Sequence, residues 1–205
     1  MQPNSIQDIL QAQRAYFQSG ATLPVRFRKA MLKRLYTAIK TREAEITAAL
    51  QADLGKPAYE SFMCEVGLSL TEITHMLRRV KKYAREHRVP TPLAQFPSRS
   101  FTKASPFGNV LIMSPWNYPF LLAMDPLADA IAAGNTAIVK PSAYSPATSK
   151  IIEKSLKNAL HLSMWRWSQA AEPKMPRCWN RNLTLCSLPA ARRWAGKSFA
   201  IRQSI

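Results

Sequence analysis

The sequence predicts an α/β fold in which amphipathic helices precede a parallel β-sheet. Two observations carry this prediction. Apolar residues recur at helical spacing up to about residue 86, and from residue 109 two short apolar runs alternate with helical segments. The order strand, helix, strand, helix with tight links is that of a βαβ unit. Apolar residues make up 47% of the 205-residue chain, enough for a packed core.

The first part of the chain, residues 1–86, is an N-terminal helical segment. Residues 5–18 form a short helix with Ser5 as its N-cap. Residues 25–53 form one helix or two in succession, because apolar residues recur every four positions. That stripe comprises Phe27, Met31, Leu35 and Ile39. Residues 59–86 form a further helix whose C-terminal end is basic, which the helix dipole favours.

Residues 87–108 are expected to be a Pro-rich linker that includes an arm strand. Four prolines in this stretch exclude a helix. The residues from Arg99 to Thr102 are predicted to form an extended edge or arm strand.

Residues 109–160 carry the expected βαβ region. The apolar runs are too short for helices and rich in strand formers, so they are predicted to be buried parallel strands. Pro126 lies inside the first helix and predicts a kink or a late start. The elements are strand Asn109–Met113, helix Pro119–Ala133, strand Thr136–Val139 and a helix from Pro146 to about Lys157.

Polar clusters follow both strands, and the carboxyl ends of parallel strands are where such sheets bind ligands. The clusters are 114–117 and 140–142. The amide of Asn117 can donate hydrogen bonds to a developing oxyanion, and the ammonium of Lys140 suits a ribose hydroxyl or a phosphate. Taken singly, an Asn after a strand is commonly a turn residue, and a Lys at a strand end is commonly solvated.

Two segments resemble signatures of the aldehyde dehydrogenase family. Met113-Ser-Pro-Trp-Asn-Tyr-Pro119 is similar to the segment around the family's oxyanion asparagine, and 125–142 is similar to its helix, Ala-Gly-Asn turn and Lys-Pro-Ser strand end. The resemblance covers roughly residues 5–156, and the helices before residue 90 look like the class-3-like branch. It implies N-terminal helices plus an incomplete Rossmann-like parallel sheet of the aldehyde dehydrogenase fold, and oxidation of an aldehyde to a carboxylate with NAD or NADP.

The resemblance also implies site roles. Asn117 would stabilise the oxyanion of a thiohemiacetal, and Lys140 would hold the adenosine ribose with Ser142 nearby. The nicotinamide and ribose side of the cofactor cleft would be lined by Met113, Ser114, Pro115 and Trp116. Many members have Glu where this chain has Ala143, which leaves NADP as plausible as NAD. An aldehyde substrate and a homodimer of the full-length protein follow from the family alone.

The three cysteines predict no disulfide and no metal site, because their number is odd and no Cys-x-x-Cys spacing occurs. Cys64 is expected to be a small buried apolar residue on a helix. Cys178 and Cys186 carry no trace of the motif around the family's nucleophile. The catalytic Cys and the general-base Glu are therefore expected to be missing, and the chain to be inactive alone.

Two other functions remain open: a non-catalytic dinucleotide-binding or interaction module, and a basic nucleic-acid-binding protein. The net charge of +17 suggests the latter. However, residues 157–205 hold nine Lys and Arg against one Glu, and the other basic residues fall mostly on outward helix faces. No nucleic-acid motif and no long apolar span accompany them. We therefore expect no nucleic-acid partner, no membrane contact and a cytoplasmic location.

Residues 161–205 no longer resemble the family, and we hypothesise that they are translated out of frame. Synonymous codons chosen for Met164 to Lys197 and read two bases later can spell a family-like sequence that includes the Phe-Thr-Gly-Ser turn. A sheet cut after about two strands would also leave an unpaired edge, which favours aggregation.

Sequencing the gene tests the frame hypothesis. The alternative frame across Cys186 to Ala191 is expected to encode the Phe-Thr-Gly-Ser turn, because the family has this turn near that position. If that frame encodes another sequence there, the hypothesis is wrong.

Overall fold

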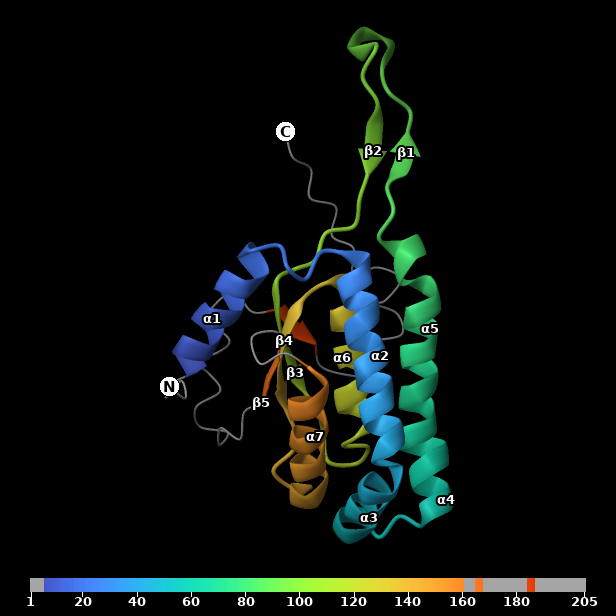
Figure 1. Cartoon of the computed structure of the whole chain (residues 1–205), viewed down its shortest axis with the longest axis vertical. Helices are drawn as coiled ribbons and strands as arrows, with labels where there is room; N and C mark the ends of the chain where they lie inside the picture. The colour runs from blue at the N-terminus through green and yellow to red at the C-terminus, as the bar shows by residue number, and fades with distance from the viewer. Residues whose placement is uncertain (1–5, 161–164, 168–183, 187–205) are drawn as a thin grey trace.

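The computed structural model describes residues 6–160, 165–167 and 184–186 (Figure 1). Its helices α2, α5, α6 and α7 lie on one face of a parallel sheet, and α1 lies on the other (Figure 1). An antiparallel arm projects away from this body. None of the helices in the described ranges is long and apolar enough to cross a membrane.

The helices of the first part of the chain match the predicted stretches, with two refinements. The stretch from 25 to 53 forms two helices, and the stretch from 59 to 86 is interrupted by a π-helical turn, η1. The predicted cap Ser5 lies outside the described residues. The elements are α1 (Ile6–Gln18), α2 (Val25–Thr41), α3 (Glu43–Leu54), α4 (Ala58–Ser61), η1 (Phe62–Val66) and α5 (Gly67–Tyr83).

The Pro-rich stretch forms the arm. Strand β2 (Ser100–Thr102) lies where an arm strand was predicted, and it pairs antiparallel with β1 (His87–Val89). A short 3-10 turn, η2 (Leu93–Gln95), lies between them. The sequence did not predict β1, because all three of its side chains are exposed and provide no apolar signal.

The βαβ region has the predicted order. Strands β3 (Asn109–Met113) and β4 (Thr136–Lys140) are parallel, and α6 (Leu121–Ala133) connects them. Helix α6 starts two residues later than predicted and contains Pro126. Helix α7 (Pro146–Ala159) follows β4.

The sheet extends beyond the two strands that were expected, so β3 and β4 are not its edges. Strands β5 (Trp165–Trp167) and β6 (Thr184–Cys186) complete a parallel sheet of order β5-β4-β3-β6. Both β3 and β4 are therefore paired on both sides. The frame hypothesis for this part of the chain stays a prediction.

The two faces of the sheet are buried differently. The main core joins the helices to Val110, Ile112 and Val139 on one face. On the other face, Leu10 of α1 packs against Leu111 and Ile138. Strand side chains alternate between the faces, so both sets come from the same two strands.

Helix α1 is also fixed to the sheet by polar contacts. The side-chain amide of Gln13 is buried and donates to the carbonyl of Ala137 at 2.9 Å. Its oxygen lies 3.4 Å from the donating amide nitrogen of Asn109. These contacts position α1 across the two strands that carry the candidate site.

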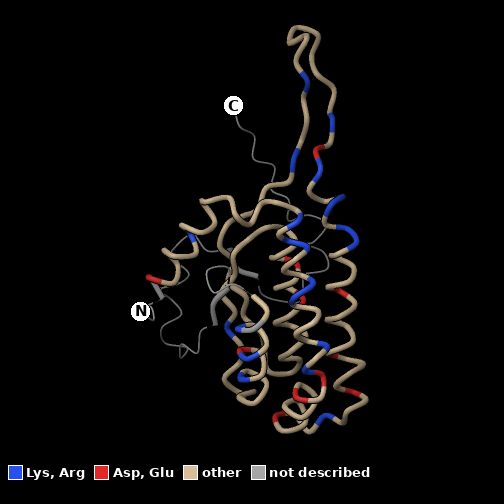
Figure 2. The backbone as a smooth tube through the Cα atoms, in the orientation of Figure 1, with Lys and Arg blue, Asp and Glu red and all other residues tan. Residues whose placement is uncertain are grey.

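Among the described residues, most lysines and arginines are exposed or partly exposed, as predicted, and Figure 2 shows their places along the backbone. Arg28 and Lys56 are buried. The guanidinium of Arg28 donates to the carbonyls of Thr22 and Ala132, at 3.2 and 3.1 Å. It thereby satisfies a carbonyl in the last turn of α6. Burial lowers the pKa of this guanidinium. Because its guanidinium is hydrogen-bonded to two backbone carbonyls, the charge of Arg28 on α2 can be buried.

Gly134 ends α6 in the left-handed region, with φ of 91°. A Cβ atom there would lie 2.9 Å from Nε of Arg28. Both the backbone conformation and the close approach of Arg28 therefore require glycine.

Three carboxyl groups lie where α5 packs against α6. Burial, together with the negative charges of Glu72 and Asp125, raises the pKa of Asp129 to about 7. Because its ordinary value is 3.8, the folded chain holds a proton on Asp129 that the unfolded chain has released between about pH 4 and 7. Stability is therefore lost as the pH rises through this range, and the loss is complete above it.

Asp129→Asn is expected to raise the free energy of unfolding at pH 8 and to leave it nearly unchanged at pH 4. The gain is a few kcal/mol at most, since one pKa unit corresponds to about 1.4 kcal/mol. Urea unfolding at both pH values measures it. The exposed control Glu45→Gln should not stabilise the chain at pH 8, because Lys154 lowers the pKa of Glu45. Equal effects of Asp129→Asn at both pH values would contradict the assignment.

Candidate functional site

The predicted polar clusters meet at one rim of the sheet. Met113 lies opposite Lys140 in the register of β3 and β4. The backbone N–H of Ser114 continues this pairing by donating to the carbonyl of Lys140 at 3.1 Å. Residues 27 positions apart are therefore neighbours at the carboxyl ends of the two strands.

The segment from Ser114 to Pro119, which we call the motif loop, connects β3 to α6. The buried hydroxyl of Ser114 donates to the carbonyl of Pro119 at 3.1 Å and closes the loop. Pro115 is half-buried and Trp116 is 57% exposed. The loop therefore has a fixed base and a tip open to solvent.

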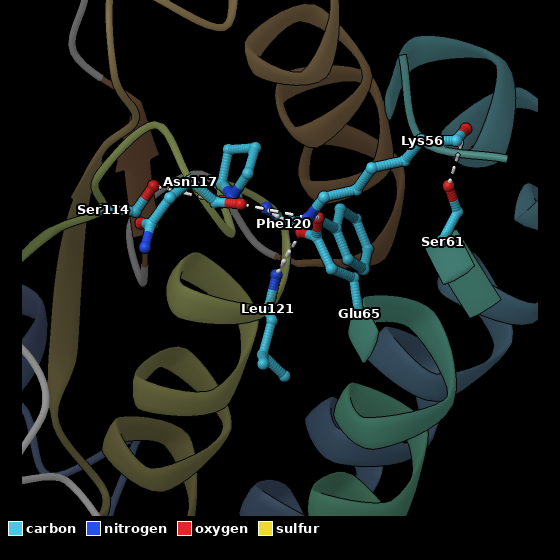
Figure 3. Close-up of polar contacts among 8 residues, drawn as sticks. Lys56, Ser61, Glu65, Ser114, Asn117, Phe120 and Leu121 are labelled. Atoms are coloured by element: carbon cyan, nitrogen blue, oxygen red, sulfur yellow. Dashed lines mark hydrogen bonds and ion pairs between the residues drawn. The ribbon is translucent and has the colours of Figure 1, made fainter. Parts of the chain in front are cut away.

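Asn117 lies at this exposed tip. Among the residues that the structure describes, no hydrogen bond engages its side-chain amide, whose N–H groups are available as donors. Its backbone carbonyl, in contrast, accepts a hydrogen bond at 3.0 Å from the ammonium of Lys56 (Figure 3).

Lys56 is buried in an ion pair with Glu65 (Figure 3). The distance from Nζ to Oε1 is 2.6 Å, and the side chains are 9% and 0% exposed. The ammonium also lies 4.0 Å from the ring centroid of Tyr118, a cation–π distance. We call these two residues the Lys56–Glu65 pair.

The second carboxylate oxygen of Glu65 caps helix α6. It accepts the backbone N–H groups of Phe120 and Leu121 at 2.9 and 3.2 Å (Figure 3). The first N–H groups of a helix have no partner within the helix, and a negative charge there also interacts favourably with the helix dipole. The pair therefore contacts the motif loop at Asn117 and the start of α6 directly after the loop.

The π-helical turn η1 orients Glu65 inward. The N–H of Gly67 bonds to the carbonyl of Phe62, five residues back. A Cβ atom at position 67 would lie 2.9 Å from that carbonyl oxygen, so the close approach requires glycine. Within this turn, Phe62 and Met63 are exposed while Glu65 is fully buried.

The Lys56–Glu65 pair was not predicted from the sequence. Lys56 stands between Gly55 and Pro57, where a solvated loop residue is expected. The signal that could have revealed the pair is Glu65 itself, because it directly precedes Val66, an apolar residue of the predicted helix 59–86. A carboxylate beside buried apolar positions requires a partner.

A second carboxylate caps helix α7. Asp53, near the end of α3, accepts the N–H groups of Ala147 and Thr148 at 3.1 and 2.7 Å. The first N–H groups of both α6 and α7 are therefore capped by a carboxylate from the N-terminal helical segment. Neither start offers a free set of N–H groups to a phosphate.

Ser142 is largely engaged in a turn. Its hydroxyl accepts the N–H of Tyr144 at 3.1 Å, and its carbonyl accepts the hydroxyl of Ser149 at 3.0 Å. The hydroxyl of Ser142 is therefore bonded within the turn before α7, while its carbonyl bonds to a side chain in the first turn of α7.

Cys64 was expected to be buried on a helix, and that expectation is wrong in its burial. It is a free, half-exposed cysteine in η1. The expectation rested on the usual burial of free cysteines, and the π-helical turn instead places Cys64 beside the exposed Met63. Within the described ranges, no group of three His, Cys, Asp or Glu side chains is arranged to hold a metal ion.

Comparison with known families and proteins gives a consistent result. The sequence model of the aldehyde dehydrogenase family matches residues 1–161. The chain is 42% identical over 151 residues to the 4,4'-diaponeurosporen-aldehyde dehydrogenase of Staphylococcus aureus, covering 74% of this chain and 33% of that protein. It is 39% identical over 158 residues to aldehyde dehydrogenase family 3 member H1 of Arabidopsis thaliana, covering 77% and 33%. The chain thus spans about a third of the length of these curated relatives.

Solved structures show the same likeness. The substrate-bound state of Staphylococcus aureus AldH superposes with a TM-score of 0.81 at 36% identity, covering 85% of this chain and 38% of that one. The glyceraldehyde-3-phosphate dehydrogenase GapN of Methanocaldococcus jannaschii, complexed with NADP, gives 0.74 at 25% identity, covering 88% and 40%.

Asp53→Ala is expected to lower the free energy of unfolding by about 1 to 2 kcal/mol, because two N–H groups of α7 lose their acceptor. Urea unfolding followed by circular dichroism measures the change. The matched control is Glu45→Ala, which removes an exposed bond between α3 and Lys154 of α7. Its cost should stay below about 1 kcal/mol. Equal costs would contradict the capping role.

Proposed function

The chain belongs to the aldehyde dehydrogenase family, and we propose that it carries the oxyanion-stabilising part and a portion of the NAD(P)-binding part of an enzyme that oxidises aldehydes to carboxylates. The observation that supports this most is the exposed side-chain amide of Asn117 at the carboxyl end of β3. Lys140 ends the neighbouring strand.

Asn117 would act on the carbonyl oxygen of the substrate. When a nucleophile adds to an aldehyde, negative charge develops on this oxygen, and an amide donor held at that position stabilises it. Removing one such donor from an enzyme commonly slows turnover by about 10²–10³-fold. The thiolate nucleophile and the general base would come from residues outside this chain. The chain alone is therefore expected not to oxidise aldehydes.

The described residues suit a ribose of the dinucleotide better than its central pyrophosphate. The ammonium of Lys140 at the rim suits ribose hydroxyls. The starts of α6 and α7 are occupied by Glu65 and Asp53, so a pyrophosphate would need another donor set. When bound, the cofactor supplies the nicotinamide that accepts a hydride. Ala143 is exposed beside the strand end and places no carboxylate against a 2′-phosphate, which suits NADP as well as NAD.

The substrate would be an aldehyde, and the full-length protein a homodimer, as the family implies. The cytoplasmic location stays a prediction. Family membership disfavours a nucleic-acid-binding function. The remaining alternative, a non-catalytic module that binds a dinucleotide, differs from the proposal in having no oxidation step when the rest of the enzyme is present.

Lys140→Ala is expected to weaken NAD and NADP binding about tenfold or more, because a charged hydrogen bond is worth roughly 1.5–3 kcal/mol. Calorimetric titration of the chain with each dinucleotide measures it. Lys150→Ala is the matched control, since Lys150 is exposed on α7 away from the strand end.

Asn117→Ala should leave dinucleotide affinity unchanged, which separates its role from that of Lys140. Equal binding by the wild type and Lys140→Ala would contradict the role assigned to Lys140. Failure of the wild type to bind either dinucleotide would contradict the retained cofactor site.

A further inference from the structure

The Lys56–Glu65 pair joins two parts of the chain that the sequence separates. Lys56 lies between α3 and α4, and Glu65 lies in η1. Their hydrogen bonds beyond the pair end on Asn117, Phe120 and Leu121. The pair thus connects the segment between α3 and α5 to the motif loop and to the start of α6.

Stability alone does not explain a buried ion pair. Removing two charges from water is expensive, and apolar residues of similar volume often serve the fold equally well or better. The geometry of this pair does more than neutralise charge. One member fixes a carbonyl in the motif loop, and the other fixes two N–H groups directly after it.

We propose that Lys56 and Glu65 are positioning residues that hold the side-chain amide of Asn117 at the place where the oxyanion forms. This inference rests on the proposed function of Asn117. It assigns no contact with the substrate to either member of the pair.

The contacts on the backbone of the motif loop fix the place of Asn117. The hydroxyl of Ser114 closes the loop onto Pro119. Lys56 fixes the carbonyl of Asn117 at 3.0 Å, and its charge lies 4.0 Å from the ring of Tyr118. Among the described residues, nothing holds the amide of Asn117 itself, so its direction follows from its backbone. An oxyanion donor works only within a narrow range of positions, and a shift of about 1 Å can cost two orders of magnitude in rate.

The test is the double variant Lys56→Met/Glu65→Leu, which replaces both charges with apolar side chains of similar size. Hydrogen exchange of the full chain, without cofactor or aldehyde, reports on the loop. We expect exchange at residues 116–121 to accelerate at least tenfold, while exchange in β4 and α7 stays as in the wild type. The matched control is Lys154→Met/Glu45→Leu, which removes an exposed pair of the same 2.6 Å length and should leave residues 116–121 unchanged.

A spectroscopic readout separates positioning from a merely structural role. The side-chain amide signal of Asn117 in a ¹⁵N spectrum, assigned by its loss in Asn117→Asp, should shift in the double variant, because release of the Asn117 carbonyl moves the amide relative to the rest of the motif loop. Unchanged exchange and an unchanged amide signal would overturn the proposal. So would a uniform acceleration over the whole chain, which would indicate a pair that only stabilises the fold.

Glu65→Gln provides a second variant in case the double variant does not fold. Its neutral amide keeps an oxygen for the N–H groups of α6 but no longer pairs with the ammonium of Lys56. The amide signal of Asn117 should still shift, and an unshifted signal would overturn the proposal. Because these measurements need no cofactor, failure of dinucleotide binding would count against the proposed function and not against the positioning role.

Discussion

Two carboxylates from the N-terminal helices hold the rim of the sheet together. Helices α6 and α7 both begin there, and the first N–H groups of each helix lack partners within it. Glu65 supplies the acceptor for α6, and Asp53 supplies the acceptor for α7. The N-terminal helices are therefore more than a cover for the sheet. They complete the hydrogen bonding of the βαβ region at the edge where its strands end.

The apolar parts of this architecture could be predicted from the sequence. Helical spacing located α2, α3 and α5, and two short apolar runs located β3 and β4, because burial imposes a period on side chains. Their parallel pairing then placed Met113 beside Lys140. The late start of α6 at Leu121 follows the motif loop, whose hydrogen bonds occupy the residues before it.

The polar parts could not be predicted in the same way. Lys56 contacts Asn117 across 61 positions, and Asp53 contacts Thr148 across 95. A single contact between distant polar residues leaves no periodic trace in either segment. The exposed strand β1 gave no apolar signal. Strands β5 and β6 pair with β4 and β3 in a stretch where the sequence predicted no strand.

The π-helical turn gives the stretch from Ala58 to Tyr83 one residue more than an uninterrupted α-helix of the same path would hold. Each residue of an α-helix advances the side-chain direction by about 100°. The extra residue therefore sets the two halves of the stretch out of phase, and Glu65 faces inward between the exposed Met63 and Leu68. Loss of a single residue here would restore a regular helix and rotate the carboxylate away from the rim. The position of Glu65 at the rim thus depends on the number of residues in this stretch, to within a single residue.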